Sequence, residues 1–145
     1  MINPSLLSPS LDRGLPKRGY SARVIFWVAV LGGPLPAVLL SAMNARAWNR
    51  LSRDAMLLVS MAVLSLAVGV FLGYQTVLTR EGVRLAVRAV ALGVVGMLWL
   101  RYGVQFRAQA YCELPRQNPW LAALACTLVG GAAMMGAGLL GTALR

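Results

Sequence analysis

The sequence contains no histidine, and among its 145 residues only two are cysteine and only four are acidic. The absence of histidine removes the commonest transition-metal and haem ligand and the usual general base. Cys112 and Cys126 do not form a metal-ligand cluster by themselves. The sequence also offers no paired carboxylates, no serine with a candidate base and no phosphate-binding loop. We therefore expect neither enzyme activity, nor a metal site, nor a cofactor.

Charge is scarce as well. Charged residues make up 12% of the chain, which is about half the share found in soluble domains. Apolar residues make up 59%, and the mean hydropathy is +0.69. The net charge of +10 comes from basic residues that stand in short clusters between apolar segments. This distribution favours contact with anionic lipid headgroups and argues against nucleic acid as a partner.

Long uncharged stretches are abundant, and one of them covers residues 55–78. About 20 apolar residues in a helix cross the ~30 Å hydrocarbon core of a bilayer. The sequence therefore predicts an all-α integral membrane bundle of four transmembrane helices. The predicted spans are residues 24–43, 55–78, 83–102 and 120–144.

Residues 1–22 are rich in proline, glycine and serine and end in a basic cluster, which predicts a disordered tail before a membrane domain of residues 23–145. The first span contains Gly32, Gly33 and Pro34, which predict a helix break by a kink or local unwinding. Such a break also occurs at the transport sites of discontinuous helices, and that interpretation stays open.

Orientation depends on how the first segment is interpreted. Four full spans place both termini in the cytoplasm, with eight basic residues inside and six outside. A re-entrant hairpin in place of the first span gives ten inside and four outside. The positive-inside rule favours the hairpin. Backbone satisfaction favours four spans, because a re-entrant turn exposed to lipid leaves donors and acceptors unpaired. We expect four spans.

Two helix starts have clear signals. Thr79 and Glu81 are placed as the N-cap and first-turn acid of the third span. Asn118 and Pro119 are placed as the N-cap and first residue of the fourth.

Small residues recur at the spacing that lets membrane helices approach closely. Gly69 and Gly73 form such a pair in the second span, and Gly136 and Gly141 belong to similar pairs in the fourth. We expect these glycines to pack helices within one bundle. A homo-oligomer interface is the alternative.

Arg84 and Arg88 are charged residues within the first turns of the third predicted span, four residues apart on one helix face. We expect both side chains to reach back to anionic lipid headgroups. The alternative is a site for an anion or an acidic substrate.

One stretch resembles a known class of sequences. It consists of Gly32, Gly33, Pro34 and Leu35, followed by Asn44, Asn49, Arg50 and Leu51. It is similar to the first span and connector of uncharacterised small bacterial inner-membrane proteins. The resemblance implies a bacterial inner-membrane setting and no particular activity.

The sequence as a whole favours a non-catalytic accessory or interaction subunit of the inner membrane. Its expected partners are the lipid bilayer with anionic lipids, other membrane proteins and further copies of itself. The alternative is a component of an oligomeric transporter or channel for small molecules or ions.

Overall fold

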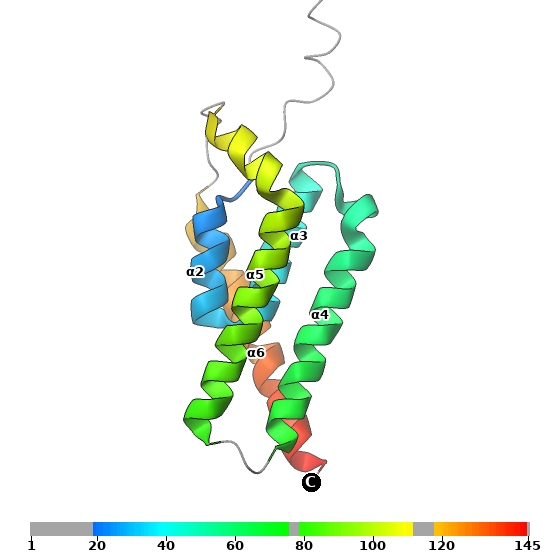
Figure 1. The fold of residues 1–145 in the computed structure, drawn as a ribbon, viewed down its shortest axis with the longest axis vertical. Coiled ribbons are helices and arrows are strands. Elements are labelled where there is room, and N and C mark those ends of the chain that lie inside the picture. The colour runs from blue at the N-terminus through cyan, green and yellow to red at the C-terminus, as the bar shows by residue number, and fades with distance from the viewer. Residues whose placement is uncertain (1–18, 76–78, 112–117, 145) are drawn as a thin grey trace, which may run out of the picture.

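The computed structural model describes residues 19–75, 79–111 and 118–144, apart from the side chains of residues 80 and 109–111. All regular structure in these ranges is helical (Figure 1). The helices are α2 (Ala22–Gly32), α3 (Pro34–Ala47), α4 (Leu51–Tyr74), α5 (Arg80–Tyr111) and α6 (Pro119–Ala143).

Three helices are long and apolar enough to cross a membrane: Leu51–Tyr74, Glu81–Ala108 and Pro119–Ala143. Their outer faces carry large exposed apolar side chains. This confirms the predicted all-helical class and agrees with a multi-pass membrane protein.

The first apolar segment differs from its prediction. Instead of one span over residues 24–43, it forms α2 and α3, which run antiparallel as a helical hairpin (Figure 1). At 1.5 Å per residue, helices of 11 and 14 residues measure about 16 and 21 Å. Both are shorter than the ~30 Å hydrocarbon core. The described residues therefore contain three candidate spans, and the span predicted over residues 24–43 is not among them.

The hairpin turns at Gly33, whose φ of +91° and ψ of −172° are strongly disfavoured for a residue with a side chain. The Gly33 N–H donates to the Ala29 carbonyl at 2.9 Å. Pro34 and Pro36, within the first turn of α3, have no N–H to satisfy. Of the four N–H groups that a helix start normally leaves unpaired, only that of Leu35 remains. The break at Gly32, Gly33 and Pro34 is thus a buried turn with few orphan donors.

Asn44 closes the other end of the hairpin. Its Oδ1 accepts a hydrogen bond from the Tyr20 N–H at 2.6 Å, and its Nδ2 donates to the Tyr20 carbonyl at 3.0 Å. The amide therefore satisfies both the N–H and the carbonyl of the residue two positions before α2. Burial raises the pKa of the Tyr20 phenol, and the Cys126 thiol acts in the same direction, so the ring stays neutral at physiological pH.

The turn from α3 into α4 is a helix-capping motif. Asn49 has a φ of +54°, which asparagine tolerates better than most residues. Its N–H donates to the Arg46 carbonyl, and the Arg50 N–H donates to the Ala45 carbonyl at 2.8 Å. These two bonds satisfy carbonyls at the end of α3 and form a Schellman motif. The chain can then enter α4 at Leu51 without further linker.

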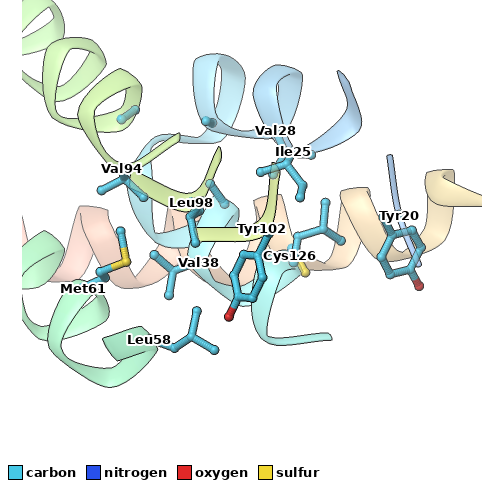
Figure 2. Packing of buried hydrophobic residues seen from close by; sticks show 14 of the residues in the cluster. Tyr20, Ile25, Val28, Val38, Leu58, Met61, Val94, Leu98, Tyr102 and Cys126 are labelled. Atoms are coloured by element: carbon cyan, nitrogen blue, oxygen red, sulfur yellow. The ribbon is translucent and has the colours of Figure 1, made fainter. Parts of the chain in front are cut away.

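The centre of the bundle is α3. Nine of its fourteen residues are buried, against four of twenty-five in α6, and it contacts each of the other four helices. Figure 2 shows Val38 of α3 in one cluster with Leu58 of α4 and Leu98 and Tyr102 of α5. The three long helices and α2 therefore surround a short central helix.

The two described ends of the chain lie at opposite ends of the bundle (Figure 1). Gly19 packs against Trp48 in the turn between α3 and α4. At the other end, Gly141 of α6 packs against Val70 and Tyr74 of α4. The expectation that both termini lie on one side of the membrane depended on four full spans. An arrangement with the described ends at opposite ends of the bundle does not support that expectation.

Both helix starts that the sequence indicated are present. The Thr79 Oγ1 accepts from the Gly82 N–H at 3.2 Å, and the Asn118 Oδ1 accepts from the Trp120 N–H at 3.3 Å. Pro119 is the first residue of α6. Helix α5, which contains the third predicted span, continues beyond residue 102 to Tyr111, so it is longer than a single span requires.

The turn at Gly33 generates the first prediction. Gly33→Ala places a Cβ on a backbone conformation that costs an L-residue about 1–3 kcal/mol, so the free energy of unfolding in detergent should fall by that amount. Gly93→Ala in α5 is the matched control, because its Cβ would meet no atom within 4 Å. Equal melting temperatures for the two variants would contradict the buried turn.

Candidate functional site

The most polar part of the described interior is an ion pair between the start of α4 and the second half of α5. Arg101 Nη2 and Nε both donate to Asp54 Oδ1, at 2.5 and 3.1 Å. The Asp54 side chain is fully buried, whereas that of Arg101 is 39% exposed. A buried carboxylate needs such a partner, because an unpaired charge in an apolar interior is very costly.

Three buried polar atoms lack a hydrogen bond of good geometry within the described part of the chain, although the Asp54 carboxylate and the Tyr102 hydroxyl interact with each other. The three atoms are Asp54 Oδ2, Tyr102 Oη and Ser41 Oγ. Ser65 differs, because its hydroxyl donates to the Met61 carbonyl of its own helix at 2.7 Å. The polar end of the bundle therefore has spare hydrogen-bonding capacity beside the ion pair.

Aromatic and polar contacts connect this ion pair to the hairpin. The Trp48 ring lies 5.7 Å from that of Tyr102 and 5.4 Å from that of Phe106, measured between centroids. In the amide orientation that satisfies both of its ends, Gln105 accepts from Arg50 and donates to the Tyr102 carbonyl at 3.2 Å. We call Arg50, Asp54, Arg101, Tyr102 and Gln105 the polar cluster. It fixes α5 to the turn between α3 and α4.

The chemistry available to the polar cluster is limited. Its one carboxylate is neutralised by a guanidinium, and the chain has no histidine to act with it. Among the described residues, no group of three or more Cys, Asp or Glu side chains lies together as a metal site. The geometry fits a structural connection between helices better than a reaction centre.

The opposite end of the bundle is held by backbone contact between α4 and α6. A Cβ on Gly73 would fall on the Gly138 carbonyl oxygen, and one on Gly141 would fall on the Val70 carbonyl oxygen. Close approach of this kind is the main source of helix association where lipid is the solvent. Gly73 and Gly141, both expected from sequence to pack helices, thus lie at this crossing.

The other two glycines expected at helix contacts differ from each other. A Cβ on Gly69 would lie 3.2 Å from the Ala137 Cβ, which is a tight contact between α4 and α6. A Cβ on Gly136 would meet nothing within 4 Å, so this residue faces away from the bundle.

The tip of the hairpin rests on α6 at a glycine that the sequence analysis did not single out. A Cβ on Gly130 would lie 2.6 Å from the Pro36 Cδ, and one on Gly32 would lie 3.0 Å from the Thr127 Cγ2. On the other side, Val87 of α5 approaches the position of a Gly33 Cβ at 3.6 Å. The two consecutive glycines at residues 130 and 131 were the sequence feature that could have indicated this contact.

Arg84 and Arg88 are exposed near the start of α5, at the end of the bundle opposite to the polar cluster. Neither side chain forms an ion pair or hydrogen bond with another described residue. Asn44, a polar residue that could have contributed to an anion site, is bonded to Tyr20 at the other end of the bundle.

Comparisons with known proteins find no match. This holds for protein-family models, for curated proteins and for solved structures. The functional conclusion therefore rests on the geometry of the chain itself.

The crossing of α4 and α6 generates the second prediction. Gly141→Ala inserts a methyl group against the α4 backbone, and overpacking of this kind costs about 1–3 kcal/mol. Gly136→Ala makes the same change in the same helix where the space is open. Thermal unfolding in detergent should show a lower melting temperature for Gly141→Ala alone. A similar loss in both variants would contradict the described crossing.

The ion pair generates the third prediction. Asp54→Asn strands a buried group and should cost about 1–3 kcal/mol of unfolding free energy. Arg101→Gln should also lower the free energy of unfolding, although solvent screens part of the attraction at this exposed side chain. The double variant should cost less than the sum, because each single change strands the other partner. Arg53→Gln, an exposed neighbour in α4, is the control and should be neutral. Additive losses of unfolding free energy in the double-mutant cycle would show that the interaction between Asp54 and Arg101 does not stabilise the fold.

Proposed function

We propose that this protein is a small multi-pass membrane protein that acts without catalytic chemistry, as an accessory or interaction subunit for other membrane proteins. The observation that carries this proposal is the position of α3. A buried helix fills the middle of the bundle, where a transport pathway would otherwise run. A filled centre and an apolar outside leave the outer helix faces as the surfaces that partners can use.

The outer faces support this proposal. Exposed large apolar residues are spread over all three long helices, and include Met56 of α4, Leu100 of α5 and Leu121 of α6. Three surface grooves between helices are lined almost entirely by apolar side chains. Contacts with other membrane helices, or with a second copy of this chain, would use these faces.

The distribution of charge supports an orientation for this proposal. The end with the polar cluster carries Arg23, Arg46, Arg50, Arg53, Arg101 and Arg107 among the described residues. Counted along the sequence with the hairpin as a re-entrant element, ten of the fourteen basic residues fall in segments on one side of the membrane and four on the other. The positive-inside rule then places the end with the polar cluster in the cytoplasm of a bacterial inner membrane. Arg84 and Arg88 meet anionic lipid headgroups of the opposite leaflet as exposed anchors.

A transporter or channel component remains the second candidate. It is favoured by the buried Ser41 hydroxyl, which has no hydrogen bond among the described residues and would suit water or a small polar solute. If that function holds, flux through vesicles containing the protein should exceed that of empty vesicles and should change in Ser41→Ala.

Affinity purification of the full chain in a mild detergent tests the first candidate. We expect at least one other integral membrane protein, or a second copy of the chain, in near-stoichiometric amount by mass spectrometry. A tagged, unrelated three-span protein of similar size is the control for detergent-induced association. A monomer without a partner, together with solute flux in vesicles, would replace the accessory role by the transport role.

A further inference from the structure

Two apolar grooves lie on the two sides of α2, which stands at one side of the bundle in Figure 1. One lies between α2 and α5, has a volume of about 170 Å³ and includes Trp99 in its lining. The other lies between α2 and α6, has a volume of about 540 Å³ and includes Trp120. Trp27 lines both grooves. The two grooves together therefore straddle a single helix.

The helix between these grooves has the length of one leaflet of a bilayer. The length of α2, about 16 Å, is close to half of the ~30 Å hydrocarbon core. After Gly32 the chain turns inward at the buried Gly33, so α2 cannot extend the grooves into the second leaflet.

The mouths of the grooves have the chemistry of a headgroup region. Arg23 is exposed in the first turn of α2 and lines the groove beside α5. Trp120 is exposed in the first turn of α6 beside the other groove. Tryptophan prefers the level of the headgroups, and an arginine there pairs with phosphate. The single described acid at this end, Asp54, is already paired with Arg101.

We propose that one anionic phospholipid binds around α2, with an acyl chain in each groove and its phosphate on Arg23. This inference rests on the proposed membrane location and identifies a ligand class that this location would supply. The site combines two apolar grooves that share Trp27 with one cation, Arg23, at the end of the groove beside α5.

A transmembrane partner helix fits the same surface less well. Such a helix is about 10 Å wide and crosses both leaflets, whereas α2 spans only one. It would also fill one groove and leave the other to lipid. A phospholipid has the length of one leaflet, two chains for two grooves and a negative charge for Arg23.

Native mass spectrometry of the full chain, extracted from vesicles of phosphatidylcholine with a tenth of phosphatidylglycerol, tests this inference. Alkali-resistant association with the vesicles is measured first, and failure there would contradict the membrane location itself. We then expect one phosphatidylglycerol to stay bound per protein. Arg23→Gln should reduce its retention about tenfold, as expected for one charge-assisted hydrogen bond, whereas Arg53→Gln should not.

A second pair of variants tests the grooves. Ala123 lines the groove beside α6, and Ala123→Phe should fill it and release the lipid. Ala132→Phe places the same side chain on an exposed part of α6 as a control. Two results would overturn the inference. The first is that phosphatidylcholine and phosphatidylglycerol are retained equally and that Arg23→Gln does not change their retention. The second is that a protein partner is bound instead and that only Ala123→Phe releases it.

Discussion

The structure depends on one constraint, which is that a chain turning inside an apolar interior must leave few backbone groups unpaired. Gly33 and the two prolines that follow meet this constraint locally, since one supplies the turn and the others lack the N–H groups that would need partners. Contacts with other helices shield the backbone of the turn further. The turn lies between Val87 of α5 and the glycine-lined surface of α6, which keeps it away from solvent and lipid alike.

The buried hairpin makes the two ends of the bundle different. At the end where α2 begins and α3 ends, polar side chains connect neighbouring segments. Asn44 binds the backbone of Tyr20, and Asp54 binds Arg101. At the far end, beyond the tip of the hairpin, α4 and α6 meet directly through glycines. The cationic and aromatic residues gather at the first end, which is where the proposed phospholipid and the proposed cytoplasmic face both lie. One short central helix thus organises the packing, the charge asymmetry and the peripheral position of α2.

Much of the architecture follows from local sequence signals. Three long apolar runs predicted three helices, and Thr79 and Asn118 marked two of their starts. The hairpin was missed because a re-entrant turn was assumed to face lipid, although the count of basic residues favoured it. Burial by helices distant in sequence removes that objection. The ion pair was also missed, because Asp54 and Arg101 lie 47 residues apart and no local pattern joins them. Likewise, spacing alone could not tell that Gly141 faces α4 and Gly136 faces away.

The central claim is that α2 and α3 form a re-entrant hairpin rather than a span. Single cysteines at Ser21, Ser52 and Thr142, in a background without Cys112 and Cys126, test it by labelling with a membrane-impermeant reagent. Ser21 precedes α2, Ser52 lies in the first turn of α4 and Thr142 lies in the last turn of α6. The hairpin predicts that Ser21→Cys and Ser52→Cys are labelled from the same side and Thr142→Cys from the other. Labelling of Ser21→Cys and Ser52→Cys from opposite sides would contradict it.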